Sequence, residues 1–168
     1  AMWARIAPFL AERYTVVADS LGGLVVVAVD DLDLTRVAMV PTPGSARAVA
    51  VDGHWAVGGD NRGALTVLDL ARPPATLAEP RWRMLMGAPI WGVAVAGPVA
   101  FVGLDNGLLV AVHLEAGIVL DRLPVAGSKV EDLVVAGRRV AALAGATLHL
   151  FDWDGARLHR LGAVPSPG

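Results

Sequence analysis

The sequence contains no cysteine, which excludes a disulfide framework, a thiolate metal site and a thiol nucleophile. Aromatic residues make up only 5% of the chain, and no apolar run approaches the roughly 20 residues that a membrane helix needs. The net charge is −2, from 16 acidic and 14 basic residues, and the basic residues form no block. These features argue against membrane insertion and against nucleic acid as a partner. The start of the chain lacks the pattern of an intact signal peptide, so a cytoplasmic location is expected rather than export.

What the sequence does contain is an internal repeat. Residues 49–70 read VAVDGHWAVGGDNRGALTVLDL, and a shift of 44 positions aligns them without a gap on residues 93–114, VAVAGPVAFVGLDNGLLVAVHL. Small, apolar and turn positions recur together, with Gly53 aligned on Gly97 and Gly63 on Gly107. A repeat of this length is typical of solenoids, propellers and arrays, so the repeat rather than any local pattern predicts the architecture.

Four copies of the unit fill the chain. Gly23, Gly63 and Gly107 are 40 and 44 residues apart, and Gly137 lies 40 residues beyond Gly97. The units cover about residues 3–43, 44–88, 89–127 and 128–168 of a single domain. Each contains short apolar runs separated by Gly, Asp or Asn turns, which is typical of strands joined by hairpins. In the first unit we predict strands near residues 6–11, 14–18, 24–29 and 37–40.

Several of these runs are apolar on both faces, among them LVVVAV at 24–29, LLVAVHL at 108–114 and LVVAG at 133–137. A strand of this kind needs cover on both sides of its sheet. Four-stranded units of about 40 residues, each covered by a neighbour in front and behind, are the blades of a β-propeller. The sequence therefore predicts an all-β protein of four tandem four-stranded antiparallel blades, either a small ring or a fragment of a larger propeller.

The unit VAVDGHWAVGGDNRGALTVLDLARP resembles the LVIVD repeats of bacterial and archaeal propeller proteins. The match is best at residues 46–73, good at 90–117, and reduced in the last unit to Gly137, Leu148 and Asp152. The third unit carries His113 where Asp69 and Asp152 stand in the others, which leaves that position no role beyond shaping a turn. The resemblance implies a scaffold for interactions and no particular reaction, because the family shares no catalytic set.

The order of the strands also bears on how a ring would close. The chain begins with an innermost strand and ends with an outermost one, so no strand remains to complete a blade from the opposite terminus. Without closure, two apolar blade faces would stay exposed. We therefore expect the chain to pair with a second copy, giving eight blades, or to pack on the remaining blades of a longer protein.

Candidate ligand positions follow from the repeat, because equivalent residues open the innermost strands and converge on the axis. These residues are Ala7, Arg47, Trp91 and Glu131. A cation, an indole and a carboxylate together can bind a polar or aromatic group. The alternative is a structural salt bridge between Arg47 and Glu131, with Trp91 capping the core. Asp132, which adjoins this position, and Arg62, in a hairpin turn, are secondary candidates.

No other motif marks an activity. The four histidines lie at positions that are not equivalent and lack metal-ligand spacing, and every serine lies in a turn. Trp82 and the methionines of RWRMLM (81–86) form a stripe that either receives a partner or packs on its own blade. We expect a non-enzymatic binding or scaffold module without metal or cofactor, which binds protein or a small ligand. The alternative is a metal-assisted hydrolase or lactonase with its site at the axis.

Overall fold

The computed structural model describes residues 5–6, 13–30 and 33–166, which form four antiparallel sheets of four strands each. In chain order the strands are β1 (Arg5–Ile6), β2 (Tyr14–Ala18), β3 (Leu24–Asp30), β4 (Asp33–Val40), β5 (Ala46–Asp52), β6 (Trp55–Asp60), β7 (Ala64–Asp69), β8 (Trp82–Leu85), β9 (Ile90–Ala96), β10 (Val99–Leu104), β11 (Leu108–His113), β12 (Ile118–Pro124), β13 (Val130–Ala136), β14 (Arg139–Ala144), β15 (Thr147–Trp153) and β16 (Leu158–Pro165). A short 3-10 helix, η1 (Pro74–Thr76), precedes β8. Within each sheet the strands pair in sequence order, so each sheet is a simple meander. No helix in the described part of the chain has the length and apolarity to cross a membrane.

The predicted architecture of four tandem four-stranded blades is confirmed, and we number the sheets as blades 1 to 4 in chain order. The repeat extends to backbone conformation. Gly23, Gly63 and Gly107, at the turns before the third strands, have φ of +80°, +85° and +82°, a left-handed conformation that favours glycine. Gly53 and Gly97 share a second left-handed conformation at +57° and +54°. Residues that the repeat aligns therefore occupy the same backbone settings.

One strand of the first unit differs from its predicted bounds, and another lies mostly outside the described residues. β4 begins at Asp33, before the predicted start at residue 37, because its ladder with β3 continues to the pair Asp30–Asp33. Its first four residues are exposed, and an outer strand that faces water needs no apolar residue to pair. Of the strand predicted near residues 6–11, the described residues include only Ile6, and the remainder lies outside them.

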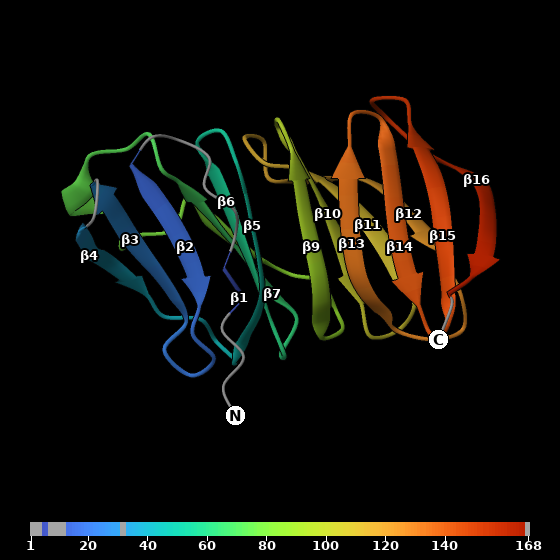
Figure 1. Cartoon of the computed structure of the whole chain (residues 1–168), viewed down its shortest axis with the longest axis horizontal. Coiled ribbons are helices and arrows are strands. Elements are labelled where there is room, and N and C mark those ends of the chain that lie inside the picture. The colour runs from blue at the N-terminus through green and yellow to red at the C-terminus, as the bar shows by residue number, and fades with distance from the viewer. Residues whose placement is uncertain (1–4, 7–12, 31–32, 167–168) are drawn as a thin grey trace.

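The blades stand face to face in sequence order along an open arc (Figure 1). The innermost strand β9 of blade 3 lies against both β5 of blade 2 and β13 of blade 4. Blade 1 packs on blade 2 through β1 and β2 against β5. In Figure 1, blades 1 and 4 lie at opposite ends of the arc, with blades 2 and 3 between them.

Three apolar cores fill the spaces between successive blades. The core between blades 1 and 2 contains Leu24 and Leu68, that between blades 2 and 3 contains Val57 and Val102, and that between blades 3 and 4 contains Phe101 and Phe151. The central strands β6 and β10 of the middle blades are buried along their whole lengths. The prediction that both faces are covered is therefore correct for blades 2 and 3.

In the end blades the described residues cover these apolar runs on one face only, as expected for a ring that the single chain does not close. In the run 24–29, Val25 and Val27 remain partly exposed, whereas Leu24 and Val26 are buried against blade 2. In the run 133–137, Val134 is exposed. A strand that is apolar on both faces needs a neighbouring element on each face. That element does not have to belong to the described residues.

The stripe of RWRMLM packs inward. Met86 is buried in the core between blades 2 and 3, and Trp82 and Met84 pack against that core. The indole Nε1 of Trp82 donates a hydrogen bond of 2.6 Å to the carbonyl oxygen of Leu114 in blade 3. The stripe is therefore part of the contact between two blades.

Arginines on two outer strands link neighbouring blades. Arg83 of β8 donates from Nη2 to the carbonyl oxygen of Pro41, at the end of blade 1. Arg160 of β16 donates from Nη2 to the carbonyl oxygens of Pro124 and Val125, at distances of 2.9 and 3.0 Å, at the end of blade 3. Hydrogen bonds from a charged donor stabilise more than neutral ones, so these links reinforce the rim.

A buried carboxylate holds the turn of blade 2. Asp60 is fully buried, and its oxygens accept hydrogen bonds from the backbone N–H groups of Gly44 at 2.6 Å, Arg62 at 2.9 Å and Ala64 at 2.8 Å. Gly44 lies in the connection from blade 1, so one side chain ties the entry to blade 2 to the hairpin between β6 and β7. Three donors satisfy the buried charge.

Candidate functional site at the axis

The candidate site lies where the innermost strands begin. Arg47 is near the start of β5, Trp91 near the start of β9, and Glu131 near the start of β13. Because β5, β9 and β13 are neighbours, these equivalent positions come from three successive blades and meet at one edge of the stack. Ala7, the fourth equivalent position, lies outside the described residues.

Trp91 is the centre of this edge. The guanidinium carbon of Arg47 lies 4.4 Å from the centroid of the indole ring, and Nζ of Lys129 lies 4.1 Å from it. The indole Nε1 donates a hydrogen bond of 2.7 Å to Oδ1 of Asp105, in the turn between β10 and β11. Each cation–π contact at an exposed site contributes about 0.5–1 kcal/mol. We call Arg47, Trp91, Asp105, Lys129 and Glu131 the axial cluster.

The ion pair at this edge is not the one that the structural alternative described. Glu131 pairs with Lys129, at 3.9 Å between Oε1 and Nζ, and Arg47 stacks on Trp91 instead. Both partners of the ion pair are 39% exposed, so the pair contributes at most about 1 kcal/mol. Trp91 itself is partly exposed at the edge rather than a cap on the core.

Of the secondary candidates, Asp132 adjoins Glu131 of the axial cluster and Arg62 lies in a hairpin turn. Asp132 is exposed, its Oδ1 accepts a hydrogen bond of 2.9 Å from the N–H of Leu133, and it lines a groove on the outward face of blade 4. Arg62 is exposed in the turn between β6 and β7, where its backbone N–H is held by Asp60.

Lys129 and Asp105 were missed by reasoning from the sequence. Lys129 lies in the loop before β13, two residues before Glu131. It is not at the position that the repeat aligns with Arg47 and Trp91, so the repeat does not identify it. Asp105 is a residue type that is common in hairpin turns, and its backbone N–H donates a hydrogen bond to the carbonyl oxygen of Pro89. The only available signal was the charge of these residues next to an indole.

The chemistry of the axial cluster favours carboxylate binding over aromatic stacking. Two cations already lie over the indole, so little ring surface is left for a ligand. Cationic donors bind carboxylates through short charge-assisted hydrogen bonds. Lys129 already holds one carboxylate, that of Glu131.

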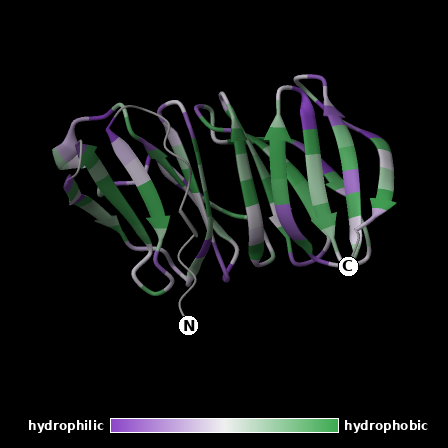
Figure 2. Cartoon of the chain, in the orientation of Figure 1, coloured by the Kyte–Doolittle hydropathy of each residue, from purple (hydrophilic) through white to green (hydrophobic). Residues whose placement is uncertain are grey.

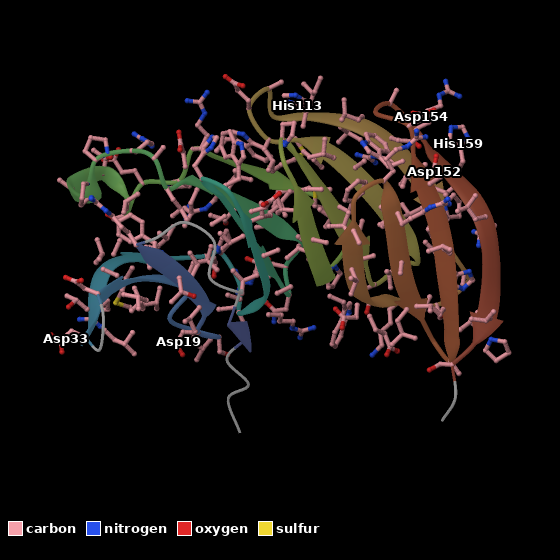
Figure 3. All side chains as sticks on the ribbon, turned by 45° about the horizontal axis from the view of Figure 1, so that its top comes forward. Asp19, Asp33, His113, Asp152, Asp154 and His159 are labelled. Carbon is pink, nitrogen blue, oxygen red and sulfur yellow. The ribbon has the colours of Figure 1, made fainter. Side chains whose placement is uncertain are left out.

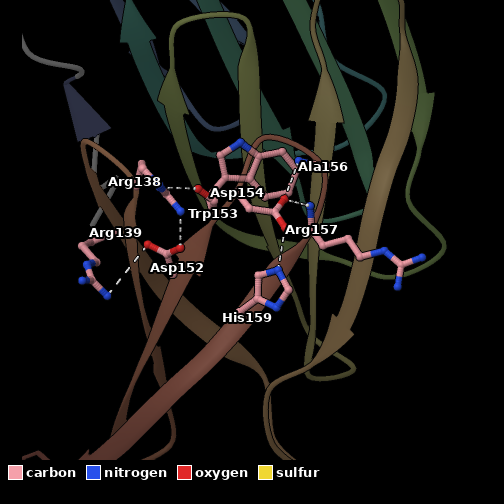
Figure 4. Close-up of polar contacts among 8 residues, drawn as sticks. All are labelled: Arg138, Arg139, Asp152, Trp153, Asp154, Ala156, Arg157 and His159. Carbon is pink, nitrogen blue, oxygen red and sulfur yellow. Dashed lines mark hydrogen bonds and ion pairs between the residues drawn. The ribbon is translucent and has the colours of Figure 1, made fainter.

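A second polar cluster lies at the other end of the stack, where Figure 3 places His113, Asp152, Asp154 and His159. Arg138 donates from Nη2 to Asp152 Oδ2 at 2.7 Å, and Arg139 Nη1 lies 3.9 Å from Asp152 Oδ1 (Figure 4). These contacts join the start of β14 and the turn before it to β15, which is already paired with β14 in one sheet. A structural role within blade 4 is enough to explain the contacts of this cluster.

Side chains at this end also shape the turns. Asp154 is hydrogen-bonded to His159 at 2.6 Å and accepts from the N–H groups of Ala156 and Arg157 (Figure 4). The hydrogen bond with His159, followed by those from Arg157 and Ala156, lowers the pKa of Asp154 below its ordinary value. His113 accepts a hydrogen bond from Ala116 N–H, as Asp69 does from Ala71 N–H, so the histidine replaces the aspartate in the same role. Among the described residues, no group of three or more His, Cys, Asp or Glu side chains is arranged to hold a metal.

Comparison with known proteins supports this description of the fold. The LVIVD repeat family matches residues 43–76, which form blade 2 from its entry to η1. No curated protein shows significant sequence similarity to the chain.

Solved structures match over nearly the whole chain. The computationally designed Ika8 protein superimposes with a TM-score of 0.79 at 14% identity, over 95% of this chain and 48% of its own. The designed Ika4 protein gives 0.73 at 14% identity, over 88% and 89%. A chain in the structure of the Mitotic Checkpoint Complex gives 0.81 at 12% identity, over 97% and 52%. The chain thus spans about half the length of Ika8 and of the checkpoint chain. The chain has the fold of a β-propeller, and its second blade matches the LVIVD repeat family.

Proposed function

We propose that the protein is a non-enzymatic binding module that takes up an acidic segment of a partner protein at the axial cluster. The observation that carries the proposal is the position of Trp91 between Arg47 and Lys129, at the edge where three blades meet. The repeat would allow the same small residue at each of these positions, yet the chain places a different functional group on each blade.

The two cations are prepared for a carboxylate in different ways. The stacking of Arg47 on the indole fixes the plane of the guanidinium, whose edge N–H groups fit both oxygens of a carboxylate. Lys129 already pairs with Glu131, which is part of the same chain. Glu131 therefore occupies the position that an acidic side chain of a partner would take. A partner displaces an exposed ion pair at low cost, because such a pair contributes little.

A protein partner is favoured over a small ligand because the edge is open and formed by several blades. One of the structures that the chain resembles belongs to a protein assembly, the Mitotic Checkpoint Complex. A cytoplasmic location belongs to the same proposal and rests on the composition of the chain.

The test is a titration followed by NMR at the indole N–H of Trp91, assigned by its loss in Trp91→Phe. The probe is the peptide Ac-GEGEG-NH2, with Ac-GQGQG-NH2 as the neutral control. We expect the glutamate peptide to shift this resonance, and added salt to weaken the binding. Arg47→Ala and Lys129→Ala should each reduce the affinity about tenfold, because each removes a charged hydrogen-bond donor.

The matched control is Arg157→Ala, which removes an exposed arginine at the opposite end of the stack and should leave the affinity unchanged. Equal shifts with both peptides, or equal weakening by Arg157→Ala, would refute the role of the axial cluster. A rise in melting temperature with Ca²⁺, Zn²⁺ or Mn²⁺, together with turnover of a lactone or ester, would replace the proposal with the metal-assisted hydrolase.

A further inference from the structure

Blade 4 carries an apolar face that no described residue covers. Val140, Ala142 and Phe151, which point toward blade 3, are buried in the core between the two blades. Residues on the opposite face, away from blade 3, are exposed or half-buried along the same strands: Val134, Ala141, Leu143, Leu148, Leu150 and Val164. We call these six residues the open front of blade 4. Figure 2 shows hydrophobic residues along the strands of this blade.

The open front corresponds to surfaces that are buried elsewhere in the chain. Leu148 pairs with Leu143 in the ladder between β14 and β15, as Leu109 pairs with Gly103 and Leu65 with Gly59 in blades 3 and 2. Leu65 and Leu109 are 0% exposed because the next blade covers them, whereas Leu148 is 39% exposed. This position is therefore a leucine in all three blades, and a neighbouring blade buries it in two of them.

Blade 1 presents the complementary surface at the other end of the arc. Its residues Val16, Ala18, Leu24 and Val26 are buried toward blade 2. The alternate residues Val17, Val25 and Val27 are only partly buried, and Met39, which pairs with Val25, is 42% exposed. We call Val17, Val25, Val27 and Met39 the open back of blade 1.

Each of the three seams within the chain joins the front of one blade to the back of the next. Here the front of a blade is the face toward the next blade in the chain, and the back is the opposite face. A front packs on a back in all three internal seams, and blade 1 has a back that no described blade covers. This chain matches about half of Ika8 and about half of the checkpoint chain, so each of those chains is about twice as long as its matched part. We propose that two copies of this chain close into one ring of eight blades, with the open front of each on the open back of the other.

The two contacts between the copies are equivalent, because a two-fold axis relates them and closes the ring after two copies. It does not depend on the axial cluster, which lies at the edge of the blades rather than on these faces. A closed ring also leaves no apolar blade face in water, which an isolated arc does.

The seam between copies differs from the seams between blades 2 and 3 and between blades 3 and 4 at the position of Gly59 and Gly103. A Cβ atom on Gly59 would lie 2.3 Å from Cγ2 of Ile90, and one on Gly103 would lie 2.7 Å from Cγ1 of Val130, so these glycines receive a side chain of the next blade. Leu143 stands at the corresponding position of blade 4, as the ladder pairs show. The seam between copies therefore packs mainly through β15 and β16, and less closely near the axis.

The test is the mass in solution by light scattering behind a sizing column, over a hundredfold range of concentration. We expect the wild-type chain at twice its mass of 17.4 kDa. Leu148→Glu, on the open front, and Met39→Arg, on the open back, should each give a folded monomer by circular dichroism. The control Leu85→Glu changes a leucine that is 75% exposed on the outer strand of blade 2, and it should leave the dimer intact.

Mixing Leu148→Glu with Met39→Arg supplies the decisive result. In the mixed pair one seam is wild type on both sides, and the other joins a glutamate to an arginine, so a dimer should form again at one copy of each. A wild-type monomer would overturn the proposal, as would a mass that grows beyond two copies. Dissociation by the front variant alone would indicate contact between two fronts and would also overturn it.

Discussion

The substitution Gly103→Ala tests the packing between blades 3 and 4 most directly. Gly103 lies in β10, and a Cβ atom there would lie 2.7 Å from Cγ1, 2.9 Å from Cβ and 3.0 Å from the carbonyl oxygen of Val130. Its φ is not left-handed, so alanine is allowed by the backbone and any cost comes from packing. Neither the branched Cβ nor the carbonyl of Val130 can move without moving β13.

The expected cost follows from two opposing terms. Overpacking a dense core costs about 1–3 kcal/mol. Replacing glycine by alanine stabilises by about 0.4–1 kcal/mol through the unfolded chain. The net loss in the free energy of unfolding is therefore about 1–2 kcal/mol. For a chain of this size this lowers the melting temperature by roughly 2–8 °C.

The same substitution at Gly127 provides the control. A Cβ atom on Gly127, in the loop between β12 and β13, meets nothing within 4 Å, and its φ is also not left-handed. Gly127→Ala should therefore stabilise by about 0.4–1 kcal/mol. Urea unfolding followed by circular dichroism, at one protein concentration, measures both. If both variants change the free energy of unfolding in the same direction, the close approach of Val130 does not explain why residue 103 is glycine.

A double variant identifies the partner. Gly103→Ala with Val130→Ala removes the methyl groups that the new Cβ would meet, so the two changes should couple by about 0.5–3 kcal/mol in a double-mutant cycle. Additive losses would contradict the contact.

Three further predictions concern single side chains. Asp60→Ala should destabilise by about 3 kcal/mol or more in urea unfolding, because it leaves three backbone donors without their acceptor, and Asp60→Asn should cost less because one oxygen remains. Burial, and then the charge of Arg160, lower the pKa of His149, so the unfolded chain binds more protons and stability should fall as the pH drops below about 6.5. His149→Val should flatten that part of the stability profile, and an unchanged profile would contradict this assignment. Trp82→Phe should cost about 0.5–1.5 kcal/mol through the lost hydrogen bond to Leu114, whereas no loss would mean that this bond contributes nothing net.

Much of the fold was predictable because each copy of the repeat has its turn residues at aligned positions. Gly63 and Gly107 mark the same turn in the sequence and have nearly the same φ in the structure. Which residues of the end blades stay exposed was not predictable, because Leu148 and Leu150 of β15 are as apolar as the leucines that a neighbouring blade covers. The residues of a strand indicate which of its faces is apolar. Only the structure shows whether a neighbouring blade buries that face.

The candidate site was predictable in position but not in pairing. The aligned positions led to Arg47, Trp91 and Glu131 at one edge, since equivalent residues on adjacent innermost strands must converge. The partner of Glu131 depended on the path of the loop before β13, which brings Lys129 to the indole. Periodicity carries no information about such a loop.

The linear order of the blades has a consequence for how the protein opens. Blades 2 and 3 each have a neighbour on both sides, whereas blades 1 and 4 each have one described neighbour. In a stack of this kind, stability is the sum of each unit and its nearest contacts, so unfolding starts at the ends. In a single copy, amide hydrogens of β15 should exchange with solvent sooner than those of β7 or β11. The middle pair of blades is then the last part of the molecule to lose its structure, and the place where folding is expected to begin.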